Sequence, residues 1–133
     1  MKKNDFGYEQ VNKDEHYNRV QEVFNNVANE YDFMNDVMSF GLHRNWKKEF
    51  VGLIEINDEN DTKILDLAGG TGDIAKRILK SHPNTSIEII DKNFMMLKES
   101  STKDNILKSN KINLICGDGE NIPLNDNSID VIT

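Results

Sequence analysis

The residues best suited to chemistry in this chain gather around a glycine-rich loop. Gly69, Gly70 and Gly72 follow a short apolar run and precede a helical pattern. Glycines at the end of a strand let backbone N–H groups approach a ligand that a Cβ atom would hold off. Three glycines in four positions exceed what an ordinary strand-to-helix turn needs, so the spacing predicts a ligand-binding loop.

Two classes of cofactor fit this loop. The pattern Gly70-x-Gly72-x-x-Ala75 satisfies the relaxed dinucleotide fingerprint, which alone would indicate an oxidoreductase domain. Asp66, however, places a negative charge where a pyrophosphate would lie, whereas a cationic sulfonium with a free amino group suits that acid. The arrangement Asp66-x-Ala68-x-Gly70-x-Gly72 resembles the first motif of class I S-adenosylmethionine-dependent methyltransferases, with Ala68 where many members have glycine.

Two further acids follow later strands of the pattern. Asp91 lies about 20 residues after Gly72, the usual place for a carboxylate that accepts hydrogen bonds from ribose hydroxyls. It could instead cap the helix that follows. The segment 116–124 resembles the methyltransferase segment that holds the adenine ring, which implies that Asp118 accepts a hydrogen bond from the adenine amino group. By the same resemblance, Thr71 and Gly119 are predicted cofactor contacts.

Alternating strands and helices must position these residues. Apolar runs predict strands at 63–67, 86–90, 111–116 and 129–133, and helical spacing predicts helices at 73–80 and from 93 to at least 98. This alternation is typical of right-handed crossovers and a mostly parallel sheet. The expected fold is therefore α/β and Rossmann-like, and incomplete because the sequence stops in its fourth strand.

The upstream region has a different pattern. An apolar stripe predicts a helix over 17–31, residues 32–46 show no clean period, and a short helix is expected over 46–54. A polar linker at 57–61 then divides the chain. We expect a helical, substrate-side region at 1–56 and the first half of a cofactor-binding α/β domain at 57–133.

The upstream region also carries the most specific motif. Residues 31–46 read Y-D-x-M-N-x-x-[aliphatic]-S-x-x-x-H-x-x-W, which is similar to the N-terminal signature of the ubiquinone/menaquinone biosynthesis C-methyltransferases. Residues 23–28 and 65–73 resemble the same family. The resemblance implies methyl transfer from S-adenosylmethionine to a ring carbon of a polyprenylated benzoquinol or naphthoquinol. Tyr31 and His43 are candidates for the substrate pocket, although packing explains each equally well, and the general base is not identified.

The composition narrows the expected partners and location. The formal charge is −7, so the chain offers no general attraction to nucleic acid. The single cysteine, Cys116, has no further Cys or His at zinc-ligand spacing, and no metal is expected. With no transmembrane run and no signal or transit peptide, the expected location is the cytoplasm. The quinol implies peripheral membrane contact, and a homodimer is a further expectation.

The resemblance also implies a longer protein. The family continues through segments that would follow Thr133, so we expect the chain alone to be marginally stable and a poor methyltransferase. Ile129, Val131 and Ile132 are expected to be partly exposed, because a parallel strand is normally covered on both faces. The alternative to an enzyme is a truncated, non-catalytic fragment of one.

Overall fold

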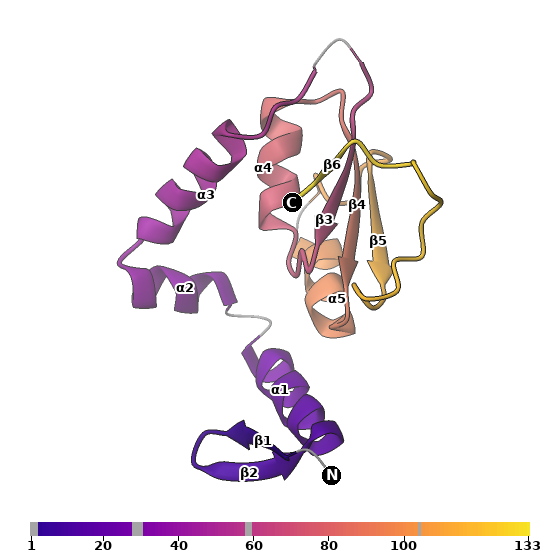
Figure 1. Cartoon of the computed structure of the whole chain (residues 1–133). Coiled ribbons are helices and arrows are strands. Elements are labelled where there is room, and N and C mark those ends of the chain that lie inside the picture. Colours follow the sequence, from indigo (N-terminus) through magenta and orange to yellow (C-terminus); the bar gives the residue numbers. More distant parts are fainter. Residues whose placement is uncertain (1–2, 28–30, 58–59, 104) are drawn as a thin grey trace.

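The computed structural model describes residues 3–27, 31–57, 60–103 and 105–133. A hairpin and three helices precede a four-stranded sheet and its two helices (Figure 1). The elements in chain order are β1 (Lys3–Phe6), β2 (Glu9–Asn12), α1 (Lys13–Val27), α2 (Tyr31–Ser39), α3 (Leu42–Gly52), β3 (Lys63–Leu67), α4 (Asp73–Ser81), β4 (Ser86–Asp91), α5 (Phe94–Lys103), β5 (Ile112–Cys116) and β6 (Val131–Ile132).

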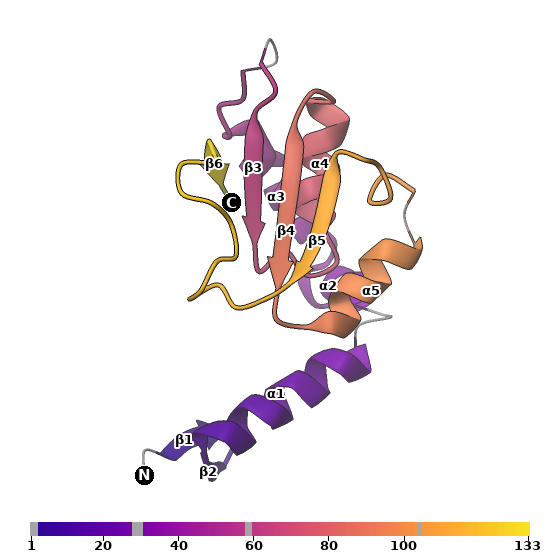
Figure 2. The same cartoon turned by 90° about the vertical axis from the view of Figure 1, so that its right-hand side faces the viewer.

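The central sheet is parallel throughout and has the order β5-β4-β3-β6. Its helices α4 and α5 connect β3 to β4 and β4 to β5, as parallel neighbours require. Helices α3 and α4 lie behind the sheet in Figure 2. The predicted Rossmann-like α/β fold is confirmed, and the predicted strands 63–67, 86–90 and 111–116 agree with the structure to within one residue at each end.

The core lies between the sheet and the helices on this face. On α4, the side chains of Ala75 and Ile78 are fully buried, as their spacing on one helical face predicts. In both strands at the centre of the sheet, neighbouring apolar side chains that point to opposite faces are buried, namely Ile64 and Leu65 in β3 and Ile89 and Ile90 in β4. The buried core cluster comprises Val51, Ile64, Ala75, Ile78, Ile87, Ile89, Leu97, Leu107 and Ile112.

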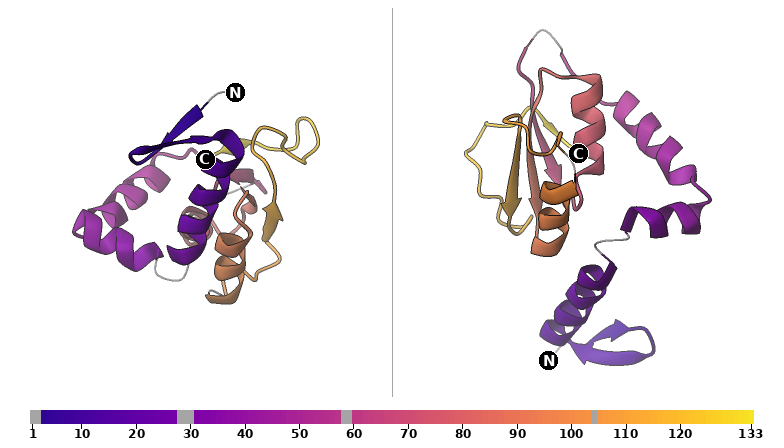
Figure 3. Two further views of the ribbon diagram at one scale, coloured as in Figure 1. Left: turned by 90° about the horizontal axis from the view of Figure 1, so that it is seen from below. Right: turned by 180° about the vertical axis from the view of Figure 1, so that it is seen from behind.

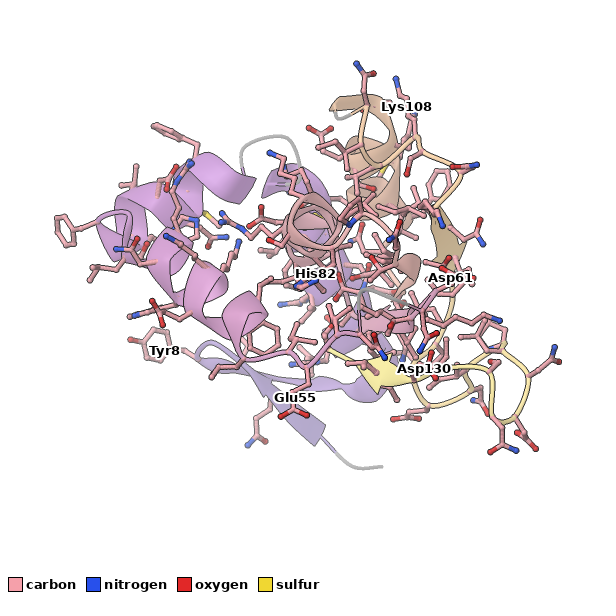
Figure 4. The ribbon with its side chains drawn as sticks, turned by 90° about the horizontal axis from the view of Figure 1, so that it is seen from above. Tyr8, Glu55, Asp61, His82, Lys108 and Asp130 are labelled. Atoms are coloured by element: carbon pink, nitrogen blue, oxygen red, sulfur yellow. The ribbon has the colours of Figure 1, made fainter. Side chains whose placement is uncertain are left out.

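The last strand is short and only partly covered. β6 pairs with β3 through Val131 and Ile132 alone, so the strand predicted at 129–133 is longer than the observed one. As expected, Ile129 and Val131 are only half-buried, and Ile132 is 62% exposed. The Asp130 carboxylate accepts a hydrogen bond from the Lys63 N–H at 2.8 Å. Asp130 lies with other acids, including Glu55 and Asp61, around the end where the strands begin (Figure 4).

The N-terminal region differs from its prediction. The helix predicted over 17–31 begins earlier, at Lys13, because the Asn12 side chain accepts a hydrogen bond from the Glu15 N–H at 2.8 Å and caps the helix. The described part of α1 ends at Val27, and the predicted continuation to residue 31 crosses residues 28–30, which lie outside the described part of the chain. The antiparallel hairpin of β1 and β2 was not predicted at all.

Residues 32–46 do form regular structure, contrary to the prediction. Helices α2 and α3 meet at Phe40 and Gly41, which both have positive φ angles of 52° and 76°. The predicted helix at 46–54 is the later part of α3, which already begins at Leu42. Periodicity did not reveal these helices because many of their apolar side chains, such as Phe33 and Trp46, are exposed and form no single buried stripe.

Helix α1 brings the N-terminal region to the site. It runs beneath the carboxyl ends of the strands, and the hairpin projects away from the sheet (Figure 3). The Asn93 side-chain amide, which is buried, donates to Gln21 Oε1 at 2.9 Å and to Asn25 Oδ1 at 3.1 Å. These bonds tie α1 to the turn after β4.

Candidate functional site

A cavity of about 390 Å³ opens beside the glycine loop at the carboxyl end of the sheet. Five predicted cofactor residues line it, and they come from β3, the loop and β4: Asp66, Gly69, Gly70, Thr71 and Asp91. Ligands of open α/β sheets bind at this edge, where the strands end. The folded chain therefore brings together the loop and the two acids that were singled out from their spacing.

The three glycines of the loop are required for different reasons. A Cβ atom at Gly69 would lie 2.8 Å from the Asp66 carboxyl carbon, so no side chain fits. Gly70 has a φ of 55° and lines the cavity. Gly72 has a φ of 75° and does not line the cavity, and a Cβ there would press on Leu107 at 3.1 Å. Packing against Leu107 and the positive φ angle explain why glycine is required at position 72. The contact of Gly72 with the cofactor stays a prediction.

Ala68 occupies a position that favours glycine. Its φ is 57°, in the left-handed region where an L side chain costs about 1–2 kcal/mol. Glycine at this position removes that strain. It also makes the unfolded chain more flexible, which lowers the stability of the folded state by less than the strain that is relieved. We therefore expect Ala68→Gly to raise the free energy of unfolding by up to about 1 kcal/mol in urea titrations.

The matched control for that substitution is Ala75→Gly, which makes the same chemical change inside α4. Ala75 is fully buried in a helix, so glycine there should lower the free energy of unfolding by about 1 kcal/mol. A loss of stability in Ala68→Gly that matches the loss in Ala75→Gly would show that the left-handed geometry carries no strain.

Asp66 lies at the floor of the cavity in an unusual environment. The side chain is buried, and within the described part of the chain its Oδ2 atom has no hydrogen-bond partner. Burial raises the pKa of Asp66 to about 6, and the nearby charge of Asp91 adds to the effect. A buried acceptor without a partner is costly, and a ligand that donates a hydrogen bond or carries positive charge would satisfy it.

Asp91 holds the loop and still faces the cavity. Its Oδ2 accepts a hydrogen bond from the Gly70 N–H at 2.9 Å, and its Oδ1 accepts one from the Asn93 N–H at 2.7 Å. The cap of α5 is Asn93 rather than Asp91, because Asn93 Oδ1 accepts from the Met96 N–H at 2.9 Å. An ionised carboxylate has about four acceptor sites, so Asp91 can bond further donors.

Other lining residues were not predicted, and three of them, Gln21, Phe24 and Lys47, come from the N-terminal helices α1 and α3. Lys47 of α3 reaches the cavity, and its ammonium lies 2.7 Å from Asp73 Oδ2. Although burial opposes ionisation, the hydrogen bond and charge of Lys47, together with Arg77, hold the pKa of Asp73 below its usual value. The remaining lining residues that were not predicted as cofactor contacts are Gln21, Phe24, Ala68, Asp73, Ile74, Asn93 and Met96.

The predicted adenine segment lies next to this cavity rather than in it. The Gly117 N–H donates to the Asp91 carbonyl at 3.0 Å, which places the segment beside the end of β4. Asp118 lines a shallower depression of about 360 Å³ with Lys92, whose ammonium is 2.9 Å from Asp118 Oδ2. The Glu120 N–H and Lys92 lower the pKa of Asp118. Gly119 packs over Leu67, and the adenine role of Asp118 and Gly119 stays a prediction.

Of the two substrate candidates, only His43 has a described side chain, and it does not line the cofactor cavity. Tyr31 begins α2, and its side chain lies outside the described residues. The His43 Nδ1 atom lies 2.9 Å from Ser39 Oγ and 3.6 Å from Asp36 Oδ1, and His43 lines a separate cavity between α3 and α4. The Ser-x-x-x-His spacing of the signature thus joins the end of α2 to the start of α3.

Comparison with known proteins agrees with the resemblance. The model of the ubiE/COQ5 methyltransferase family matches residues 10–133. The chain belongs to this family. Among the described residues of this family member, no helix is both long and apolar enough to cross a lipid bilayer.

Two relatives show how much of the family's length the chain represents. The mitochondrial 2-methoxy-6-polyprenyl-1,4-benzoquinol methylase of Caenorhabditis elegans is 39% identical over 99% of this chain and 47% of its own length. The ubiquinone/menaquinone biosynthesis C-methyltransferase UbiE of Methylobacterium nodulans is 41% identical over 97% of this chain and 52% of its own length. The chain therefore spans about half the length of the curated relatives it matches.

Solved structures share the fold of this ubiE/COQ5 family chain. The methyltransferase bound to the Trm112 activator of Haloferax volcanii has a TM-score of 0.62 and 16% identity, over 82% of this chain and 45% of its own. The plantazolicin methyltransferase BpumL, solved with SAH, has a TM-score of 0.53 and 21% identity, over 89% of this chain and 48% of its own. At this identity the likeness supports the methyltransferase fold alone.

Proposed function

We propose that this chain is the cofactor-binding half of an enzyme that methylates a ring carbon of a polyprenyl benzoquinol or naphthoquinol in ubiquinone or menaquinone biosynthesis. The observation that carries the proposal is the cavity at the glycine loop, floored by the buried Asp66 and flanked by Asp91, in a member of the ubiE/COQ5 family. The family match favours S-adenosylmethionine over the dinucleotide alternative.

The lining residues fit S-adenosylmethionine. Asp66 Oδ2, which has no hydrogen-bond partner among the described residues, suits the cofactor's ammonium. Lys47 is positively charged and suits the cofactor's carboxylate. Gly69 and Gly70 leave room that side chains would fill. Asp91 offers its remaining acceptor sites to the ribose hydroxyls. The hydrogen bond from the Gly117 N–H to the Asp91 carbonyl places the segment of Asp118 beside Asp91, and we propose that Asp118 accepts a hydrogen bond from the adenine amino group.

The chemistry then needs little from the protein beyond alignment. Bound S-adenosylmethionine would supply an electrophilic methyl group for direct displacement by a ring carbon. The loop and the two acids hold the cofactor in one orientation, which is the main contribution that positioning makes to such a reaction. The apolar side chains that line the cavity, including the partly buried Ile74 and the buried Met96, would help to exclude water from it. The general base for the quinol hydroxyl is not among the residues assigned here.

The pKa of Asp66 gives the cofactor site a predicted pH dependence. A raised pKa means that the free protein holds Asp66 partly protonated near pH 6, and the ammonium of the ligand favours the ionised form. Affinity should therefore fall as the pH falls through about 6. We expect S-adenosylhomocysteine to bind about tenfold more weakly at pH 5 than at pH 7.5 in calorimetric titrations.

The control for this pH effect is Asp66→Asn, which keeps the shape and removes the titration. Its affinity should be weaker at pH 7.5 and nearly constant down to pH 5. An equally steep fall in the Asn variant would assign the pH dependence to another group and contradict the role given to Asp66.

Methyl transfer itself is tested in a longer protein. The chain, continued after Thr133 with the remainder of the Methylobacterium nodulans relative, should transfer a labelled methyl group from S-adenosylmethionine to a demethylated quinol. The 133-residue chain should not do so at a comparable rate, because the relatives are about twice as long. Absence of transfer by the longer protein, when it is folded and binds the cofactor, would refute the proposed substrate class.

Further parts of the proposal concern organisation and location. We assign residues 1–56 to the substrate side and 57–133 to the cofactor-binding half, with peripheral membrane contact through the quinol. In a bacterial host the expected location is the cytoplasm, while the Caenorhabditis elegans relative is mitochondrial. A homodimer of the longer protein is also proposed, and light scattering during gel filtration would test it.

A further inference from the structure

A second cavity, separate from the cofactor site, lies between the start of α3 and α4. Its volume is about 270 Å³. Four of its described lining residues are cationic and one is a carboxylate, although the whole chain carries a net charge of −7. The lining residues are His43, Arg44, Asp73, Lys76, Arg77 and Lys80.

Three of these cations, Arg44, Lys76 and Arg77, form ion pairs with Asp36 or Asp73. The side chains of Lys76 and Arg77 are only 26% and 27% exposed. Asp73 orients Arg77, with an Nε–Oδ2 distance of 3.3 Å, and also binds Lys47. Asp36, whose pKa is lowered chiefly by its hydrogen bond from Arg44, holds that guanidinium by two contacts.

The chemistry of the lining suits an anion. The described lining residues include four cations and one carboxylate, and the attraction between an anion and a cation is stronger at a partly buried site than in bulk water. A dianion with several oxygens would fit this lining, because guanidinium and ammonium groups are the usual ligands of phosphoryl oxygens.

We propose that this cavity binds a phosphoryl dianion, carried either by a soluble phosphate compound or by a lipid headgroup. Asp73 lines both this cavity and the cofactor cavity, so the two sites are neighbours. Exposed apolar side chains beside Arg44, namely Phe40, Leu42 and Trp46, would lie at a membrane interface if the phosphate belongs to a lipid.

The test uses the 133-residue protein and two charge-matched variants. In the first, Lys76→Gln is combined with Lys80→Gln, which removes two cations from the cavity without touching the cofactor lining. In the control, Lys98→Gln is combined with Lys108→Gln, at exposed positions that do not line the cavity. Both variants have the same net charge, and thermal unfolding checks that both are folded.

Pyrophosphate, titrated by calorimetry at low salt, is the soluble probe. We expect saturable binding that weakens about tenfold or more in the Lys76/Lys80 variant and changes less than about twofold in the control, because each lost charge-assisted hydrogen bond is worth about a factor of ten. Equal weakening in both variants would show a general charge effect and overturn the proposal, as would the absence of saturable pyrophosphate binding.

Vesicles distinguish the two sources of the phosphate. The protein is sedimented with phosphatidylcholine vesicles, with or without phosphatidylglycerol. Sedimentation that needs phosphatidylglycerol, is lost in the Lys76/Lys80 variant and is competed by pyrophosphate identifies a lipid headgroup. Pyrophosphate binding with no vesicle binding identifies a soluble phosphate compound. Equal vesicle binding by the Lys76/Lys80 variant and the control variant would show that the cavity does not bind the lipid headgroup.

Discussion

Replacing Gly70 with valine is expected to abolish binding of S-adenosylmethionine and S-adenosylhomocysteine. Gly70 has a φ of 55°, where a β-branched residue is strained, and its N–H bonds to Asp91 Oδ2 at 2.9 Å. A Cβ atom there would point toward Met96 Cε at 3.5 Å, inside the cavity. Valine therefore both fills the site and distorts the loop, and calorimetry should show affinity reduced about a hundredfold or more.

Gly52→Val is the matched control for this change. Gly52 ends α3, has ordinary backbone geometry, and a Cβ atom there would meet nothing within 4 Å. The control should bind the cofactor as the unchanged chain does. Unchanged affinity in Gly70→Val, with the same thermal unfolding temperature, would rule out the loop as the docking point.

Replacing Asp91 with alanine is expected to weaken cofactor binding by about ten- to a hundredfold. Hydrogen bonds from ribose hydroxyls to a carboxylate are charge-assisted and worth about 1.5–3 kcal/mol. Asp91 also supports the loop through the Gly70 and Asn93 N–H groups, so part of the loss could be indirect. The measurement must therefore separate recognition of the ribose from support of the loop.

An analogue of S-adenosylhomocysteine without ribose hydroxyls makes that separation. If Asp91 binds the ribose, removing the hydroxyls should weaken binding to the unchanged chain strongly and to Asp91→Ala only slightly, because the two losses share one interaction. Asp126→Ala, which removes an exposed carboxylate outside the cavity, controls for charge. A loss below about twofold in Asp91→Ala, or equal effects of the analogue on both proteins, would leave Asp91 with a structural role only.

The parts of the fold that could be predicted are those with strong local patterns. β3, α4 and β4 combine apolar runs, a helical stripe and glycine or proline boundaries, and all three lie where expected. In the N-terminal helices, many of the apolar residues of the sequence are not buried in the structure. In α2 and α3 the residues Phe33, Met38 and Trp46 are more than half exposed, so no buried face gives the sequence a clear period. The start of α1 was set by the Asn12 cap rather than by the apolar stripe.

The candidate site also has a part that could be predicted from the sequence and a part that could not. The meeting of the glycine loop, Asp66 and Asp91 could be predicted, because adjacent parallel strands end at one edge. Lys47 and Gln21 could not, since their approach depends on how α3 and α1 pack against the sheet. His43 was part of a recognisable signature, but its cavity and its hydrogen bond to Ser39 emerged only in the folded chain.

The central claim is that the cavity beside Gly69 and Gly70 binds an adenosyl amino-acid cofactor and not a dinucleotide. Parallel calorimetric titrations of the 133-residue chain with S-adenosylhomocysteine and with NAD⁺ test it most directly. The account predicts saturable, one-to-one binding of S-adenosylhomocysteine that is lost in Gly70→Val, and no detectable binding of NAD⁺. Saturable binding of NAD⁺ that Gly70→Val abolishes, with no response to S-adenosylhomocysteine, would contradict it.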